Sequence, residues 1–112
     1  MNYEELFAMA KMDLDRCLAT LERKSHDYAN DGDVLKNFKE SSKIASITPV
    51  QSILVLVGTK ISRLTELVTT EKISKNESVE DTILDLINYL LLLKAMIEEQ
   101  REKTKSSGFI SA

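Results

Sequence analysis

The chain has few residues that break regular structure or form covalent cross-links. Its 112 residues include three glycines, one proline, one cysteine and no tryptophan. So few turn-forming residues disfavour an all-β fold of many short strands, because such a fold needs frequent tight turns. The single cysteine, Cys17, excludes an internal disulfide and a cysteine-ligated zinc site.

Neither sign of charge dominates the composition. There are 15 Lys and Arg residues against 18 Asp and Glu residues, which gives a net charge of −3. Duplex nucleic acid is therefore not an expected partner, since a protein that wraps a duplex needs a strongly basic face. The apolar fraction of 43% is enough for a core at this length. We expect one domain over residues 1–104 and a flexible tail over residues 105–112.

Long apolar runs and targeting signals are missing as well. No apolar run is longer than that of residues 89–93, which is far shorter than the ~20 residues that cross a bilayer. The N-terminus lacks the basic and apolar segments of a signal peptide. The expectation is a cytoplasmic protein without a membrane partner.

Apolar residues recur every three or four positions along most of the chain, which is the period of amphipathic helices. We expect helices over about residues 3–24, 34–46, 49–70 and 78–103. Asn, Asp and Gly residues predict a loop over residues 25–33. Two sets of apolar residues are expected to point inward: Tyr3, Leu6, Phe7, Ala10, Leu14, Cys17, Leu18 and Leu21 in the first helix, and Val34, Leu35, Phe38 and Ala45 in the second.

Capping signals mark the starts of the last two helices. Thr48, Pro49 and Gln51 have the order of a cap, a first helical residue and a capping-box partner. Ser78 and Asp81 have the spacing of a second capping box. The sequence therefore predicts an all-α fold, an antiparallel bundle of about four helices.

The last expected helix is apolar in nearly every direction between residues 79 and 97. Such a helix must be covered on more than one side, and three neighbours in a small domain do not achieve this. We therefore expect a homo-oligomer with the last helix in the interface.

Two cations interrupt the apolar stripe of the third helix. Lys60 lies four residues after Leu56, and Arg63 lies one turn beyond Lys60. A desolvated cation needs a partner. Two interpretations stay open: an ion pair with a carboxylate of the last helix, or a phosphate clamp in which Arg63 supplies a fork of donors and Lys60 a point charge.

A polar stripe follows one face of the last helix. Glu77, Asp81, Asp85 and Asn88 are spaced by four, four and three residues. Carboxylates one turn apart suit magnesium, so Glu77, Asp81 and Asp85 are the candidate metal ligands. Capping and the helix dipole also favour acids at Glu77 and Asp81. For Asp85 and Asn88, pairing with Lys60 and hydrogen bonding to a ligand both stay open.

The expected loop and the helix after it hold further candidates. Tyr28 and Phe38 offer stacking surface to a base, and Lys24 offers a charge to phosphate. The alternative is that both aromatic rings fix the loop to the core. His26 is a candidate general base or a solvated polar residue, and Asn37 precedes Phe38.

Three strings of residues together resemble one family. They are residues 24–28 (Lys-Ser-His-Asp-Tyr) with Asn37 and Phe38, residues 60–64 (Lys-Ile-Ser-Arg-Leu), and residues 77–89 with Glu77, Glu80, Asp81, Asp85, Asn88 and Tyr89. Over about residues 23–98 the chain resembles the nucleotide modification-associated domain of the first type, whose members are small all-helical phage and prophage proteins. The last helix is also distantly similar to MazG-like all-α nucleoside triphosphate pyrophosphatases. Those hold magnesium with two acidic motifs, whereas this chain offers one, with Lys60 and Arg63 where the second is needed.

These observations favour binding of a nucleotide or cyclic-nucleotide-type small molecule without turnover and without a required cofactor. The expected ligand-binding residues are Lys24, His26, Tyr28, Asn37, Phe38, Lys60, Arg63, Asp85 and Asn88, and no catalytic residue is assigned. The phage setting that the resemblance implies suggests a sponge, that is, a protein that sequesters an immune-signalling nucleotide in the host cytoplasm. One alternative is a magnesium-dependent pyrophosphatase that uses Glu77, Glu80, Asp81 and Asp85. The other is a structural bundle that binds partner proteins, in which Lys60 forms an internal ion pair.

Overall fold

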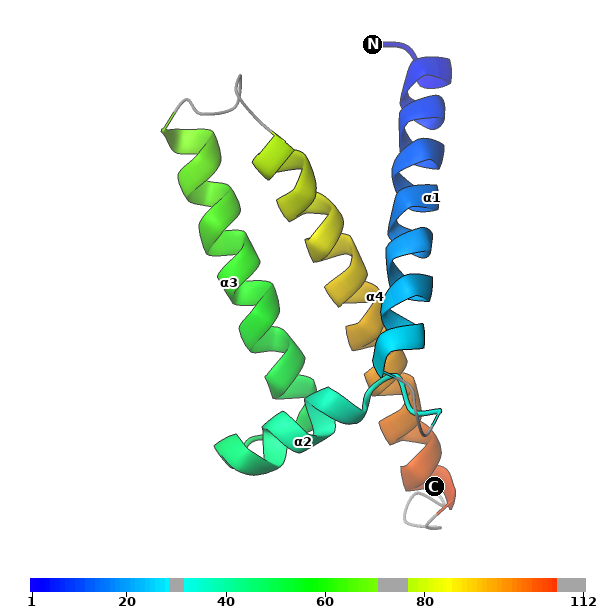
Figure 1. Ribbon diagram of the computed structural model, residues 1–112, viewed down its shortest axis with the longest axis vertical. Coiled ribbons are helices and arrows are strands. Elements are labelled where there is room, and N and C mark those ends of the chain that lie inside the picture. Colours follow the sequence, from blue (N-terminus) through cyan, green and yellow to red (C-terminus); the bar gives the residue numbers. More distant parts are fainter. Residues whose placement is uncertain (29–31, 71–76, 107–112) are drawn as a thin grey trace.

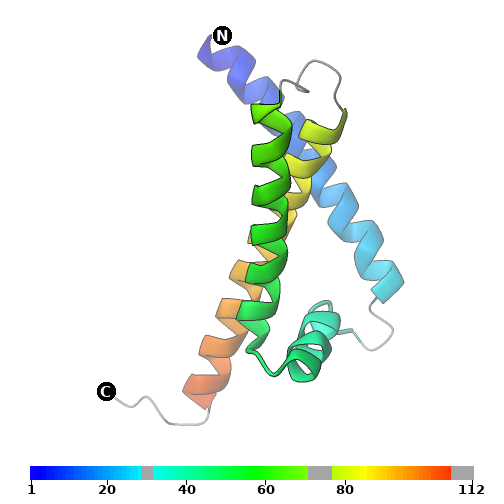
Figure 2. The ribbon, with the colours of Figure 1, turned by 90° about the vertical axis from the view of Figure 1, so that its left-hand side faces the viewer.

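The computed structural model of the chain describes residues 1–28, 32–70 and 77–106, and these ranges form four α-helices without a strand. The helices are α1 (Tyr3–Tyr28), α2 (Lys36–Ala45), α3 (Pro49–Thr69) and α4 (Glu77–Ser106). α3 and α4 run antiparallel, α1 lies on the other side of α4, and the short α2 crosses the end at which α3 begins (Figures 1 and 2). The predicted all-α bundle is confirmed.

Local side-chain chemistry sets the start of α3. The Thr48 hydroxyl accepts a hydrogen bond from the Gln51 backbone N–H at 3.1 Å, and the Gln51 side chain accepts one from the Thr48 N–H at 2.9 Å. Pro49, which has no N–H to satisfy, takes the first turn. The predicted capping box is therefore confirmed.

The other helix ends differ from the predictions by several residues. α1 continues to Tyr28, so the prediction that a loop begins at Ser25 is wrong. Residues 25–28 include neither glycine nor proline, so nothing in them stops a helix. α4 continues to Ser106, which places residues 105 and 106 in the helix and not in a tail. The remainder of the predicted tail, residues 107–112, lies outside the described residues.

α2 begins at Lys36, two residues later than expected. The cause is a turn that Asp33 stabilises. Its Oδ1 accepts from the Leu35 N–H at 3.0 Å, and its backbone carbonyl accepts from the Lys36 N–H at 3.2 Å. Val34 therefore sits in the turn and is exposed, as is Ala45, and the prediction that these two point inward is wrong.

The buried core lies where α2, α3 and α4 meet. Leu35, just before α2, packs with Ile53 and Val57 of α3 and with Met96 of α4. Partly buried apolar side chains surround these four: Phe38, Val50, Leu86, Tyr89, Leu92 and Leu93. The core is small, so the cohesion of the domain depends on few side chains.

α1 is attached mainly through its middle. Cys17 is buried, and its thiol lies 3.8 Å from the Leu84 carbonyl of α4. Burial raises the pKa of the Cys17 thiol, so it stays a protonated donor to that carbonyl. Five apolar residues of the predicted inward stripe are exposed: Tyr3, Leu6, Phe7, Leu14 and Leu18. For these the inward prediction is wrong, because no other described element covers that side of α1.

α4 has most of its apolar surface covered by its neighbours. Three of its large apolar side chains are exposed: Ile83, Leu90 and Leu91. The prediction that α4 forms an oligomer interface stays a prediction.

A sharp turn joins α2 to α3. Ser46 ends α2 in the left-handed conformation (φ 57°), and the Ile47 N–H donates to the Ser42 carbonyl at 3.0 Å. The two helices consequently meet at 95°. No single helix of the described residues is both long enough and apolar enough to cross a membrane, and α2 and α3 meet these two requirements only together, across this bend.

Candidate functional site

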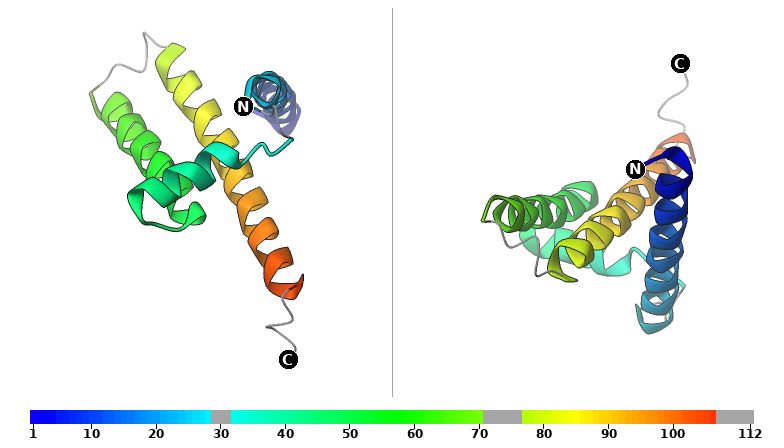
Figure 3. Two further views of the ribbon diagram at one scale, coloured as in Figure 1. Left: turned by 60° about the horizontal axis from the view of Figure 1, so that its bottom comes forward. Right: turned by 90° about the horizontal axis from the view of Figure 1, so that it is seen from above.

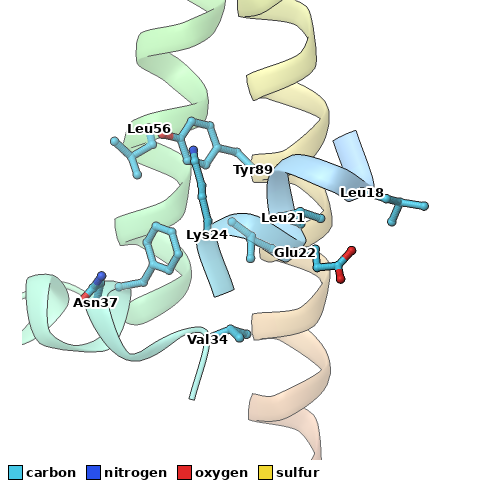
Figure 4. A pocket seen from close by; sticks show the side chains of 10 residues that line it. Leu18, Leu21, Glu22, Lys24, Val34, Asn37, Leu56 and Tyr89 are labelled. Carbon is cyan, nitrogen blue, oxygen red and sulfur yellow. The ribbon is translucent and has the colours of Figure 1, made fainter. Parts of the chain in front are cut away.

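A groove with a volume of about 630 Å³ lies where the lower half of α1 faces α2, α3 and α4. Most of its lining side chains are apolar or aromatic. They are Leu18, Leu21, Glu22, Lys24, Val34, Asn37, Phe38, Leu56, Tyr89 and Leu92 (Figure 4). Residues from all four helices therefore contribute to one concave surface.

Three of the predicted ligand-binding residues meet in this groove. Lys24 comes from α1, whereas Asn37 and Phe38 come from the first turn of α2. The Lys24 side chain extends in the direction of Tyr89 and Leu56 across the groove (Figure 4). The groove thus combines a cation, an amide and two aromatic rings, and the role of these groups in binding stays a prediction.

An ion-pair network fixes α2 at the base of the groove. The Lys39 ammonium donates to Asp33 at 2.8 Å and also bonds Glu99 of α4, which lies 3.9 Å from Lys103. Its hydrogen bonds to Asp33 and then to Glu99 raise the pKa of Lys39 above the ordinary 10.5. The network therefore connects α2 both to the turn that precedes it and to α4.

Alkaline pH is expected to weaken this network. A lysine whose pKa is raised by folding stabilises the fold fully below pH 10.5, and that contribution is lost as the pH rises through the folded-state pKa. Lys39→Met should lower the free energy of unfolding by about 1 kcal/mol at pH 7, and the difference from the original chain should shrink above pH 10.5. Urea unfolding at both pH values measures this.

The matched control is Lys94→Met. Lys94 forms an exposed pair with Glu98 at 3.7 Å within α4. Removing it should change the free energy of unfolding by less than about 0.5 kcal/mol at either pH. Equal losses for the two variants would show that the Lys39 network does not hold α2.

Lys60 lies one helical turn beyond the groove. Its ammonium is 2.9 Å from a carboxylate oxygen of Asp85, and the two side chains are 26% and 38% exposed. Lys60 follows Leu56 by four residues and Asp85 precedes Tyr89 by four, so the pair continues the two helix faces that line the groove. Of the two interpretations of Lys60, the ion pair with a carboxylate of the last helix is the one observed.

Arg63 is placed differently. It is exposed on α3, one turn further from the groove, and no carboxylate of the described residues lies within ion-pair distance of it. The phosphate clamp therefore has one cation in an ion pair and one directed to solvent. Clamp formation by these two residues stays a prediction.

Asn88 is a buried polar residue whose side-chain oxygen lacks a hydrogen-bond donor among the described residues. Its side chain is 6% exposed, and its Oδ1 has no hydrogen-bond partner among the described residues. A buried acceptor without a donor costs about 1–3 kcal/mol. Asn88 is the residue before Tyr89, which lines the groove.

The magnesium site predicted at Glu77, Asp81 and Asp85 stays a prediction. Asp81 is exposed, and Asp85 is paired with Lys60. In the part of the chain that the structure describes, no group of three or more His, Cys, Asp or Glu side chains lies close enough to hold a metal ion. The side chain of Glu77, like those of His26 and Tyr28, lies outside the described residues.

Several groove residues were not expected to form a site. Leu18 and Leu21 carry the helical period of a core stripe, and Leu56 and Leu92 do so too. One feature of the sequence could have identified Tyr89 as a site residue: it follows Asn88 in the string that carries the family resemblance. Apolar lining residues give no other signal, because the same pattern predicts a core.

Comparison with known proteins gives no relative: no family model, no curated protein and no solved structure matches the chain. The resemblance to the nucleotide modification-associated domain therefore stays a prediction.

Proposed function

We propose that the groove between the four helices binds a nucleotide-type small molecule and does not turn it over. The observation that carries this proposal is the meeting of Lys24, Asn37, Phe38 and Tyr89 around one concave apolar surface. Small-molecule sites usually have volumes of about 300–1,000 Å³, mostly apolar walls and a few polar groups. The groove matches that description with about 630 Å³.

Four of the polar or aromatic lining groups have a task in this proposal. The rings of Phe38 and Tyr89 pack on the base. The Asn37 amide, which both donates and accepts hydrogen bonds, binds the polar edge of the base. The Lys24 ammonium binds a phosphate oxygen at the rim as a point charge. Lys60 and Asp85 form an ion pair one helical turn beyond the lining, and the buried Asn88, whose Oδ1 has no partner among the described residues, precedes the lining residue Tyr89.

Binding without turnover follows from the side chains that line the groove. Among the described residues the lining includes no serine, threonine, cysteine or histidine, and its single carboxylate is Glu22. Phosphoanhydride hydrolysis needs an activated water and stabilisation of the transition-state charge. If a phage encodes the chain, we propose more specifically that it is a sponge, which sequesters a cyclic-nucleotide signal without cleaving it.

A thermal-shift screen tests the proposal. The probes are mono-, di- and cyclic nucleotides, each with and without magnesium. A probe present at 100 times its Kd stabilises the fold by about 2.7 kcal/mol, which corresponds to roughly 10 °C in Tm for a chain of this size. Lys24→Ala should weaken the binding of that probe about tenfold with the fold intact, because it removes the phosphate contact.

Lys11→Ala is the control for Lys24→Ala. Lys11 is also an exposed lysine of α1 but does not line the groove, so its removal should leave the shift unchanged. The bound probe should be recovered unaltered after the complex is denatured by heat. Absence of any shift, equal weakening by both variants, or recovery of a cleaved probe would each contradict the proposal.

A further inference from the structure

An ion pair lies at one end of the groove. Lys60 of α3 and Asp85 of α4 face each other, with 2.9 Å between the ammonium and a carboxylate oxygen. Lys60 follows the lining residue Leu56 by four residues, and Asp85 precedes the lining residue Tyr89 by four. Because α3 and α4 run antiparallel, both steps lead in the same direction (Figures 1 and 3). The pair is therefore a single helical turn beyond these two lining residues.

The Lys24 side chain is directed toward the same end of the groove. α1 and α3 lie on either side of α4 (Figures 1 and 3). From α1, Lys24 extends in the direction of Leu56 and Tyr89 (Figure 4). Lysines of two different helices therefore lead to one end of the groove. A phosphate monoester carries a charge of about −1.5 to −2 at pH 7, which two ammonium groups balance better than one.

The ion pair is open to solvent and therefore to an incoming anion. The side chains of Lys60 and Asp85 are 26% and 38% exposed. Ion pairs with such exposure contribute little to stability, because water competes for both charges. A phosphate oxygen offers Lys60 the same kind of charge-assisted hydrogen bond as a carboxylate oxygen does. An anion that replaces the carboxylate on Lys60 therefore has little to overcome.

We propose that Asp85 takes the place of a ligand phosphate on Lys60, and that the phosphate of a nucleotide displaces it. The phosphate then lies between the ammonium groups of Lys24 and Lys60. One ionic contact replaces another, and no covalent bond forms or breaks. Asp85 is thus an internal competitor that lowers the affinity of the groove for phosphate. This inference rests on the proposed binding of a nucleotide in the groove.

Asp85→Asn tests the proposal, because it removes the competing charge and keeps the size of the side chain. The probes are AMP, GMP, CMP and UMP, each beside its nucleoside, in calorimetric titrations of the full chain. The variant should bind the monophosphate about fivefold more tightly, the gain from releasing one exposed ion pair. Binding of the nucleoside, which has no phosphate, should change less than about twofold. Asp85→Ala has high helix propensity and should give the same gain if the amide variant does not fold.

Glu98→Gln is the matched control. It makes the same change from carboxylate to amide on α4 and raises the net charge of the chain by the same amount. It breaks the exposed pair with Lys94, whose two charged atoms are 3.7 Å apart, and neither residue lines the groove. Binding of the monophosphate should be unchanged. Equal tightening in the two variants would show a general effect of charge and would overturn the proposal.

Lys60→Met shows whether the gain depends on Lys60. Alone it should weaken binding of the monophosphate about fivefold, because one of the two cations is lost. The gain from Asp85→Asn should fall from about fivefold in the original chain to about twofold in the Lys60→Met chain. An equal gain in both would mean that Asp85 repels the phosphate directly and does not compete for Lys60.

Inorganic phosphate separates this inference from the proposed function. Compared with chloride at equal ionic strength, it should raise the Tm of Asp85→Asn at least about 2 °C more than that of the original chain. If no nucleotide binds but this difference is present, the phosphate site stands and the proposed function fails. If a nucleotide binds and Asp85→Asn leaves its affinity unchanged or weaker, this inference fails and the proposed function stands. No response to either probe contradicts both.

Discussion

Ile53→Ala is expected to lower the free energy of unfolding by about 2–5 kcal/mol. Ile53 is fully buried and packs with Leu35, Val57 and Met96, so it joins α3 to α4 and to the turn before α2. Truncation removes buried methyl groups and leaves a cavity that the three elements cannot close. For a chain of this size the loss corresponds to a fall in Tm of about 8–20 °C. Urea and thermal unfolding measure it.

Ile44→Ala is the matched control for this prediction. It makes the same chemical change on α2, at a side chain that is 87% exposed. Its effect should stay within about 0.5 kcal/mol. If both variants had similar stability, the assignment of Ile53 to the centre of the core would be wrong.

Opposite effects are expected from two substitutions at Asn88. Asn88→Leu keeps the number of side-chain non-hydrogen atoms and removes the buried Oδ1 that has no donor, so it should raise the free energy of unfolding by about 1–2 kcal/mol. Asn88→Asp replaces the amide with a buried carboxylate three residues after Asp85 and should lower it by about 3 kcal/mol at pH 7.

The pH dependence of Asn88→Asp provides an internal check. Burial disfavours the ionised carboxylate, so the loss of stability should be present above the ordinary carboxyl pKa of about 4. It should fade below that pH, where the group is protonated in both the folded and the unfolded chain. Unfolding by urea at pH 7 and pH 3.5 measures both variants. A stability loss in Asn88→Leu would show that the Asn88 oxygen has a donor after all.

The sequence correctly predicted features that are determined by residues close together in the chain or by the residue type itself. The start of α3 is set by Thr48, Pro49 and Gln51 alone, so it was predicted correctly. Lys60 interrupts an apolar stripe, and burial of a cation requires an anion, so one of its two interpretations led to Asp85. The start of α3 required no knowledge of the tertiary structure, whereas the choice between the two interpretations of Lys60 did.

Features that depend on which helices become neighbours were not predictable in the same way. The period of α1 identifies Tyr3 and Phe7 as members of an apolar stripe, but periodicity does not say whether another element covers it. The groove is a second example. Lys24 and Asn37 were singled out by residue type, whereas Leu56 and Leu92 are indistinguishable in sequence from core residues.

The balance of formal charge around the groove has a consequence for how a ligand arrives. Lys24 is accompanied by Glu22 on the lining, Lys60 is neutralised by Asp85, and the whole chain carries −3. No long-range field therefore draws in a polyanion, and association rates should respond weakly to ionic strength. If the groove binds a nucleotide as proposed, a triphosphate should bind less readily than a ligand with a single phosphate, because its excess negative charge finds no counterpart.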